Sequence, residues 1–573
     1  MLLIKLLLLY TIFCNTPDNF PKDRSIFISP VKIPLALSAN FGELRSDHFH
    51  SGVDIKTGGV TGKEIVAAAD GYVYRISITP GGFGKALYLK HPSGYSTVYG
   101  HLEGFIPEID EYVKKNQYEK KSFSVSLFPP AGMFRFRQGD LVAWSGNTGS
   151  SSGPHLHYEI RKSDSEMPVN PLLFDFGTGD DIAPVIERLA VYPLSRGTII
   201  NGKKDVQKLP VSGGHGNYYL PSGRTLQISG PAGFGIKAYD LLNDSYNRCA
   251  VYSIEMKIDS VTMYRNLFDQ FAFSETKYIN AHIDYQTLLK EKTYYQKTFV
   301  LPNDKLSVYN NLKDRGIYTF NDTAIHHVEI IVTDVHNNIS RLKFTITGNI
   351  QPDSNAGKTH DDGLIPMPYN RNNRFRAENI TLTIPAGSLY DTLFFSYSSN
   401  AGTKEMYSDI HNVHNIYTPL HRAYSLSIKP RNIPEGREDK LLILQLINGT
   451  GRNSIGGSLA DGYVTASASV FGSFCVGIDT VAPVISANGL KPGSDLSGRK
   501  ELRIRITDDL SGINTYEGFI DGKWALFEYD QKNNLLVYKF DSGRIISDSV
   551  HSLRLTVTDK KNNESILHTD FRW

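Results

Sequence analysis

The chain has 573 residues, enough for roughly three to five domains that each bury a core of their own. Its 61 basic and 59 acidic residues nearly cancel, which argues against a nucleic-acid binder and against a polybasic membrane surface. Tyr, Phe, Thr, Ser and Gly are plentiful, and long helical runs of Ala, Leu, Glu and Lys are absent, so the composition predicts a mainly β protein. The cysteines, Cys14, Cys249 and Cys475, lack the clustered spacing of a disulfide framework or a cysteine zinc site.

The N-terminus, MLLIKLLLLYTIFCNTPDNF, has one lysine before an apolar run from Leu6 to Phe13. The run is short and close to the terminus, which favours a secretory signal peptide over a transmembrane helix. We therefore expect residues 1–22 to be a signal peptide and the mature chain, without a transmembrane segment, to lie in the periplasm, the cell envelope or outside the cell. Because Phe13 stands where a lipoprotein signal prefers a small residue, a lipid anchor at Cys14 is the less favoured alternative.

Residues 23–178 predict a compact antiparallel β domain. Turn signals such as PGGFGK at 80–85 and HPSGY at 91–95 separate short apolar or alternating runs. These runs lie at 64–69, 71–78, 86–91, 96–102, 141–144 and 155–160. A longer connection between Leu102 and Gly139 interrupts the pattern, and the FSVSLF stretch within it alternates as an additional strand would.

Two phrases recur later in the chain and predict a duplicated module. DIAPVI, at 181–186, is echoed by TVAPVI at 480–485, and VTDVHNN at 332–338 is echoed by VTDKKNN at 557–563. An opening phrase and a closing hairpin indicate two copies of an Ig-like β-sandwich, the first with insertions. The predicted divisions are an Ig-like sandwich at 179–349, a linker at 350–375, a β-rich domain at 376–478 and a second Ig-like sandwich at 479–573.

The stretch GPHLHYEIR at 153–161 alternates with a period of two, as a strand with different faces does. One face holds His155, His157, Glu159 and Arg161, and the other holds Leu156, Tyr158 and Ile160. An edge strand with solvated histidines explains the pattern, and so do two imidazoles that converge on a metal or a substrate. The HxH pair alone decides nothing, since a second one, HFH, stands at 48–50.

The same predicted domain contains further groups that bind metals. HFHSGVD carries His50 and Asp54 four residues apart, and YSTVYGHL places His101 on the face of Tyr95, Thr97 and Tyr99. A hydrolytic zinc site needs three protein ligands and an open position, and histidine nitrogen and carboxylate oxygen suit zinc at about 2.0–2.2 Å. Two further histidines can act on a proton or an oxyanion. The available set is His50, Asp54, His101, His155 and His157.

Four stretches in order, FGELRSDHFHSGVDI, GKEIVAAADGYVYRI, YSTVYGHL and GDLVAWSGNTGSSSGPHLHYEIR, resemble the lysostaphin/LytM-type zinc metallopeptidases that cut peptidoglycan cross-bridges. The resemblance covers about residues 38–174. It implies an antiparallel β-sheet peptidase domain with one zinc ion per chain, and the several β-sandwich domains predicted after it are not part of the resemblance. The implied metal ligands are His50, Asp54 and His157, and the implied catalytic residues beside the water are His155 and His101. The implied function is an exported zinc metalloendopeptidase that acts on peptide stems or cross-bridges of peptidoglycan.

Other residues of this domain have plainer explanations. His48 lies outside the motif, so we expect it to be solvated or to stand beside the site, and His91, before Pro92, is typical of a turn. Arg45 either orients a carboxylate of the site or forms an exposed ion pair.

Two competing functions remain open at this point. GSSSG at 149–153 fits the nucleophile elbow GxSxG, around Ser151, but that elbow needs a following helix and a strand is predicted here. A catalytically silent module that binds the cell wall or activates another hydrolase is the other alternative, although no ligand is missing. The sandwiches hold no comparable cluster, so we expect them to place or tether the enzyme. A chain that ends near Gly177 is then expected to fold, bind zinc and cut small peptides.

Overall fold

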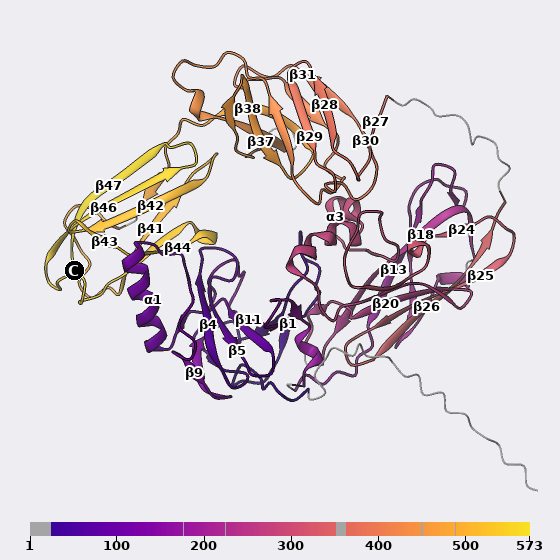
Figure 1. Ribbon diagram of the computed structural model, residues 1–573, viewed down its shortest axis with the longest axis horizontal. Coiled ribbons are helices and arrows are strands. Elements are labelled where there is room, and N and C mark those ends of the chain that lie inside the picture. The colour runs from indigo at the N-terminus through magenta and orange to yellow at the C-terminus, as the bar shows by residue number, and fades with distance from the viewer. Residues whose placement is uncertain are drawn as a thin grey trace, which may run out of the picture.

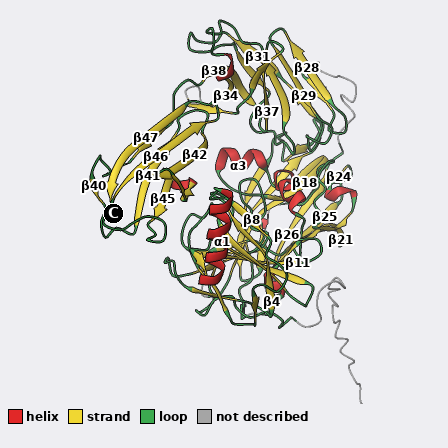
Figure 2. Cartoon of the chain, turned by 60° about the vertical axis from the view of Figure 1, so that its left-hand side comes forward, coloured by secondary structure: helices red, strands yellow, loops and turns green. Residues whose placement is uncertain are grey.

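The computed structural model describes residues 24–175, 177–223, 225–243, 245–350, 363–447, 451–487 and 489–573. The predicted signal peptide, with Cys14, and much of the predicted linker lie outside these residues. Strands dominate the described chain and pair mostly antiparallel, which confirms the mainly β fold class (Figure 2). Among the described residues, none of the helices has the length and apolar composition that a membrane crossing needs.

The N-terminal domain is built from a large sheet and a small sheet. Its strands are β1 (Leu37–Ala39), β2 (Val53–Lys56), β3 (Glu64–Val66), β4 (Gly71–Ile78), β5 (Lys85–Lys90), β6 (Tyr95–Gly100), β7 (Gly104–Phe105), β8 (Val125–Leu127), β9 (Arg135–Phe136), β10 (Leu141–Trp144), β11 (His155–Lys162) and β12 (Pro168–Val169). The large sheet has the order β1-β2-β11-β6-β5-β4-β8, with β12 beside β11 and β9 beside β4, and the small sheet has the order β3-β10-β7. The strand predicted within FSVSLF is β8.

Strand β11 lies inside the large sheet, between β2 and β6. Leu156, Tyr158 and Ile160 are fully buried in the core of the domain, which confirms the predicted alternation. The opposite face is buried as well, since His157 is 3% exposed and Glu159 is 0% exposed. The interpretation of β11 as an edge strand with solvated histidines is therefore wrong.

The connection between β7 and β8 contains a helix that the sequence analysis did not predict. Helix α1 (Pro107–Lys120) has a proline in its first turn, and Glu108 and Asp110 there suit the positive end of the helix dipole. The residues that it buries are Ile109, Val113 and Gln117. So narrow a stripe produces a weak apolar period, which is why the pattern did not indicate a helix.

Residues 185–348 form the next sheet, with a helical insertion. In sheet order its main strands are β15 (Gln207–Pro210), β13 (Val185–Pro193), β18 (Leu226–Leu241), β26 (Ile339–Gly348), β25 (Ile325–Thr333), β20 (Ser253–Ile258), β21 (Val261–Leu267) and β23 (Tyr309–Leu312). The insertion between β21 and β23 carries α2 (Ile279–His282) and α3 (Tyr285–Glu291).

Each of the remaining two modules consists mainly of a pair of sheets. In the module within 365–478 the first sheet has the strands β28 (Asn373–Ala377), β29 (Ile380–Ile384), β33 (Tyr424–Ile428), β37 (Tyr463–Ala468) and β36 (Ser458–Ala460). Its second sheet has the strands β31 (Tyr397–Asn400), β32 (Ile410–Val413), β38 (Gly472–Ile478), β34 (Leu441–Ile447) and β35 (Gly451–Ser454). In the last module the first sheet has the strands β39 (Val484–Ser486), β41 (Glu501–Thr507), β45 (Leu535–Lys539) and β44 (Phe527–Asp530). Its second sheet has the strands β40 (Ser494–Asp495), β47 (Glu564–Arg572), β46 (Val550–Asp559), β42 (Ile513–Ile520) and β43 (Lys523–Ala525).

The recurring VTDxxNN phrases form equivalent hairpins in the second and the last module. The Asp334 carboxylate accepts hydrogen bonds from the backbone and side-chain amides of Asn338. Ser340, just after this turn, donates to the carbonyl of Pro184 in the opening phrase. The same bonds recur in the later copy at Asp559, Asn563, Ser565 and Pro483. Both phrases therefore have the same structural role in the two copies.

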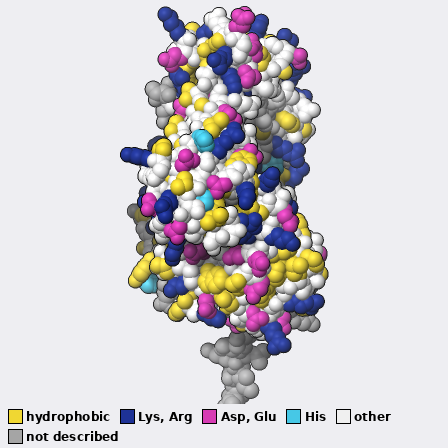
Figure 3. All heavy atoms as spheres, turned by 90° about the vertical axis from the view of Figure 1, so that its left-hand side faces the viewer, with side chains coloured by type: hydrophobic (Ala, Val, Ile, Leu, Met, Phe, Trp, Pro, Cys, Tyr) yellow, Lys and Arg dark blue, Asp and Glu magenta, His cyan; other side chains and the backbone are white. Residues whose placement is uncertain are grey.

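The modules follow a closed path, so that the last one lies beside the N-terminal domain (Figure 1). Leu526 and Tyr529 pack against the core of that domain, and Trp524 meets Tyr118 of α1 edge-on with 5.3 Å between ring centroids. The face of the molecule on this side carries interspersed acidic and basic side chains (Figure 3). The last module is therefore docked on the N-terminal domain.

The second module also supports the N-terminal domain, at the loop before β2. Phe41 and Phe49 are 2% and 1% exposed, and they pack with Phe268, Phe271 and other residues of the insertion. A chain that ends near Gly177 would expose both phenylalanines. These contacts therefore make separate folding of residues 23–178 more demanding than the sequence alone indicates.

Candidate metal centre

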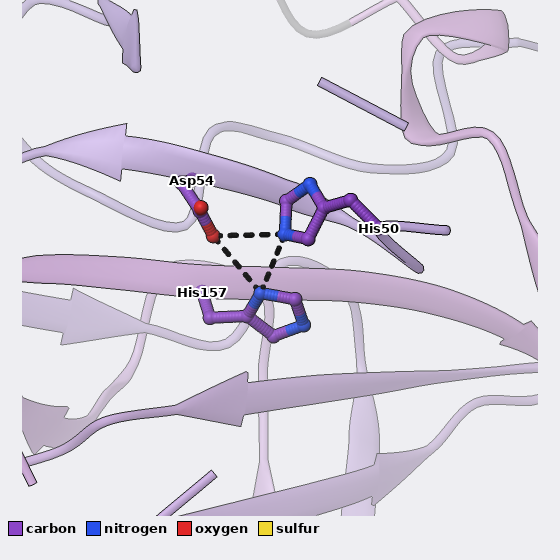
Figure 4. Close-up of side chains that lie close together, drawn as sticks. All are labelled: His50, Asp54 and His157. Atoms are coloured by element: carbon purple, nitrogen blue, oxygen red, sulfur yellow. Dashed lines mark hydrogen bonds and ion pairs between the residues drawn. The ribbon is translucent and has the colours of Figure 1, made fainter. Parts of the chain in front are cut away.

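The strand register places two of the expected ligands opposite each other. In the antiparallel pair of β2 and β11, Asp54 is the direct partner of His157, so both side chains leave the sheet on the same face. His50 precedes β2, and its ring points to the same place (Figure 4). Position 52 requires glycine, because a Cβ there would lie 2.3 Å from the carbonyl oxygen of Tyr158.

Three potential ligand atoms converge at this place. Asp54 Oδ1 lies 3.0 Å from His50 Nε2 and 2.9 Å from His157 Nδ1, and these two nitrogens are 3.0 Å apart. The far nitrogen of each ring already has an acceptor. His50 Nδ1 lies 2.8 Å from the carbonyl oxygen of Asn40, and His157 Nε2 lies 2.9 Å from Glu159 Oε1.

These hydrogen bonds decide what the two rings present to each other. A proton on each far nitrogen leaves a lone pair on each facing nitrogen, next to a carboxylate oxygen. Three electron-rich atoms at such short distances are complementary to a cation, and two imidazole nitrogens with one carboxylate oxygen are a donor set that fits zinc.

A buried chain of polar and charged groups supports His157 from behind. Ser51 donates to Oε1 of Glu159, and Arg161 Nε donates to Oε2 of Glu159 at 2.6 Å. Burial opposes the ionisation of Glu159, but Arg161 and His157 outweigh it and lower its pKa to about 2. Burial also opposes protonation of His157, yet its bonds to Asp54 and Glu159 raise its pKa to about 9. The surroundings of this ring therefore favour positive charge, which either a second ring proton on Nδ1 or a cation bound there in its place would supply.

The second oxygen of Asp54 is held by an arginine. Arg45 Nη2 lies 3.1 Å from Asp54 Oδ2, so of the two roles open to Arg45 the structure shows the orientation of a site carboxylate. Burial would raise the pKa of Asp54, but the neighbouring histidines outweigh it and hold that pKa well below its usual range. Asp54 therefore presents an ionised oxygen to the centre.

The other two expected histidines stand beside this centre. His155 Nε2 lies 3.5 Å from Asp54 Oδ1, and the rings of His101 and His155 meet edge-on with 4.8 Å between centroids. His101 Nδ1 lies 2.9 Å from the carbonyl oxygen of Thr148, and His155 Nδ1 lies 2.8 Å from that of Gly153. Both rings therefore donate through Nδ1 to a loop carbonyl, which leaves Nε2 as the nitrogen with a lone pair.

His101 reaches this position through a turn that the alternation did not predict. Strand β6 ends at Gly100, and a continued strand would direct the next side chain to the core face of Tyr99. His101 has φ of 60°, in the left-handed region, and its ring lies beside His155 and His157 instead. The prediction that His101 shares a face with Tyr99 is therefore wrong. Burial, together with the two histidines, lowers the pKa of His101 to about 3.

Sequence reasoning gave no role to several groups that complete the centre. Phe83 stacks on the ring of His157 with 4.8 Å between centroids. Glu159 lies on the same face of β11 as His157, and the period of two could have indicated its contact. Asn40 and Thr148 act through backbone carbonyls, so their side chains offered no signal.

The remaining candidates lie away from the metal centre. The side chain of His48 is 53% exposed and pairs with Asp47, as expected for a solvated residue. His91 is buried and bridges the carbonyl of Asp70 and the hydroxyl of Thr97, a structural role. After Ser151 the chain enters strand β11 and not a helix, so the nucleophile-elbow interpretation is wrong.

Comparison with known proteins gives two family matches and several relatives. Residues 48–118 match peptidase family M23, and residues 365–479 match the Zu5-like domain. An uncharacterized metalloprotease of Haemophilus influenzae is 35% identical over 154 residues, which are 27% of this chain and 26% of that protein. The DD-carboxypeptidase/endopeptidase Mpg of Neisseria meningitidis serogroup B is 32% identical over 129 residues, 22% of this chain and 23% of that protein. The murein hydrolase activator NlpD of Salmonella dublin is 32% identical over 135 residues, 24% of this chain and 28% of that protein.

The sheet and its cluster of histidines and aspartate thus belong to a metallopeptidase class of domain. More specifically, the chain contains a domain that matches peptidase family M23, and relatives of this domain are named as a metalloprotease and as a DD-carboxypeptidase/endopeptidase. The match to the family includes His50, Asp54 and His101. The chain spans about a quarter of the length of the curated relatives that it matches.

Proposed function

We propose that this protein is a zinc metalloendopeptidase that hydrolyses peptide cross-links or stems of peptidoglycan. The observation that carries the proposal is the convergence of His50 Nε2, Asp54 Oδ1 and His157 Nδ1, with the far side of each ring already bonded. The substrate class is supported by the peptidase family M23 match and by the relative named as a DD-carboxypeptidase/endopeptidase.

In this proposal His50, Asp54 and His157 hold one zinc ion, and a zinc ion so bound supplies Lewis-acid activation. His155 and His101 act through Nε2, which is an acceptor in the tautomer fixed by the loop carbonyls. His155 can take the proton that an attacking water loses, whereas His101, which burial and the neighbouring histidines keep neutral, can hold that water through its Nε2 acceptor. Once protonated, the His155 ring can stabilise the developing oxyanion and pass the proton to the leaving amine.

We also propose that the protein is exported, on the strength of the apolar run and the polar residues after it in the first 22 residues. A lipid anchor at Cys14 is the alternative. Mass spectrometry of the N-terminus of the protein purified from cells separates the two, because a processed N-terminus near residue 23 fits export alone. A lipid-modified Cys14 would establish the anchor, and an intact Met1 would contradict both.

A second candidate is a catalytically silent module that binds the cell wall or activates another hydrolase. The likeness to a protein named as a murein hydrolase activator favours it. Against it, the three residues proposed as ligands and the two histidines proposed to assist are all present and close together.

The test uses the full-length protein, with metal analysis and mass spectrometry of the products from purified peptidoglycan. We expect one zinc ion per chain and the release of fragments with a newly formed amino terminus at a peptide bond. The variant His48→Ala, at the exposed histidine of the HFH pair, is the matched control and should behave as the wild type. A protein that binds zinc and sacculi but releases nothing would support the second candidate and contradict the proposed activity.

A further inference from the structure

The loop at 147–153 holds both assisting histidines. The Thr148 carbonyl accepts from His101 Nδ1, and the Gly153 carbonyl accepts from His155 Nδ1. The hydroxyl of Ser151 lies 3.2 Å from the same nitrogen of His155. Since these carbonyls fix the tautomer and the orientation of each ring, the position of the loop decides where the two Nε2 atoms point.

This loop is in turn held by a residue from the far end of the sequence. Lys532, in the turn between β44 and β45 of the last module, donates to the backbone carbonyls of Asn147 and Ser151. Its Nζ lies 2.8 Å from the carbonyl of Ser151 and 3.0 Å from Oδ1 of Asn147. Lys532 therefore binds the loop on both sides of Thr148. It lies 385 residues from Asn147 in the sequence.

The turn that carries Lys532 is anchored on the N-terminal domain by a partly buried ion-pair network. Glu528 Oε2 lies 3.0 Å from Lys85 Nζ, and Glu528 Oε1 lies 2.9 Å from Lys539 Nζ. The side chain of Lys85 is 11% exposed and that of Glu528 24% exposed, so water screens this contact only in part. Lys85 also donates to the carbonyl of Glu103, at 3.3 Å.

A second contact holds the last module against α1. The guanidinium of Arg544 lies over the ring of Tyr118, 3.9 Å from its centroid, and Lys114 pairs with Asp541. The hydrogen bonds from Lys532 to the loop are thus part of a docked interface and are not an isolated surface contact.

We propose that Lys532 is a positioning residue of the peptidase centre, through which the last module holds the loop of the two assisting histidines in its working geometry. This role goes beyond the placing or tethering expected of a sandwich module. The part of the inference that concerns turnover rests on the proposed function, whereas the part that concerns the loop does not.

The test compares full-length wild type with Lys532→Met, Lys532→Arg and Lys491→Met. Methionine keeps the apolar stem but removes the donors, arginine keeps a cation with donors, and Lys491 is an exposed lysine of the same module. Hydrogen–deuterium exchange of residues 145–153, zinc content, kcat and KM are measured on each protein.

We expect Lys532→Met to raise amide exchange in 145–153 several-fold and to lower kcat about fivefold to tenfold, with KM within twofold and zinc retained. Lys532→Arg should recover most of both effects, and Lys491→Met should show neither. Unchanged exchange in Lys532→Met would overturn the inference, and so would raised exchange with unchanged or higher kcat. If the wild type cuts no substrate, the proposed function fails, while the exchange comparison still decides whether Lys532 holds the loop.

Discussion

The histidines of the centre fall into two groups that are held in different ways. His50 and His157 are fixed by buried partners within the N-terminal domain, the carbonyl of Asn40 and the carboxylate of Glu159. The other two, His101 and His155, are fixed by carbonyls of one loop, which the last module contacts. Metal affinity should therefore depend on strand register and buried charge. Turnover should depend in addition on a loop that is supported from outside the domain.

The largest effect is expected when a ligand is removed. Asp54→Ala and His50→Ala each leave two donors, too few for a stable zinc site, so zinc content should fall to near zero and turnover to background. Metal analysis after dialysis and peptide release from peptidoglycan measure this, with His48→Ala as the control. Full zinc occupancy in both ligand variants would show that the ligand set is wrong.

Removing His101 should separate the two groups of histidines. His101→Ala is expected to keep its zinc, because the three ligand atoms converge without it. Turnover should fall by about 10²–10⁴-fold, since the acceptor that holds the attacking water beside His155 is lost. If His101→Ala turns over about as fast as the wild type, His101 takes no part in the mechanism. If the variant loses zinc, His101 belongs with the ligands.

The carboxylate of Glu159, which holds His157, should affect the affinity for zinc more than the turnover. Glu159→Gln removes the negative charge that faces His157 Nε2, and the affinity for zinc should weaken about 10–100-fold. Titration against a competing chelator measures the change, with turnover at saturating zinc recorded in parallel. Glu166→Gln, which alters the more exposed partner of Arg161, is the matched control. An unchanged zinc affinity in Glu159→Gln would contradict this role.

The smallest effect concerns the docking of the last module and its dependence on pH. Burial opposes the ionisation of Glu528, but Lys85 and Lys539 outweigh it and lower its pKa from 4.5 to about 2. The ion pairs therefore stabilise the folded chain above pH 4.5, and this stabilisation is lost as the pH falls toward 2.

Thermal unfolding of wild type and Glu528→Gln over a pH series measures this contribution. The wild type should unfold at a higher temperature by a few degrees at pH 7, and the difference should shrink below pH 4.5. Glu435→Gln, an exposed residue outside the interface, should show no such difference. A difference that is constant over the whole pH range would mean that Glu528 acts without its charge.

The features of the site that depend on local spacing could be predicted from the sequence. The HxxxD spacing of His50 and Asp54 and the alternation of β11 indicated the residues that the structure brings together, because strand geometry fixes side-chain direction. The ring of His101 was placed on the wrong face, since a single left-handed residue reverses that direction. Helix α1 was missed because it buries so narrow a stripe. The contact of Lys532 could not be predicted, because it depends on how distant modules pack.

The most direct test of the division between the two groups is made on strand β11 itself. His155→Ala and His157→Ala alter the same strand at positions two residues apart, and zinc content and turnover are measured on both variants side by side. We expect His157→Ala to lose zinc and turnover, whereas His155→Ala should keep one zinc ion per chain and lose turnover by about 10²–10⁴-fold. Loss of zinc in His155→Ala together with retention in His157→Ala would contradict the assignment of His157 as the ligand, because the roles of the two residues would then be exchanged.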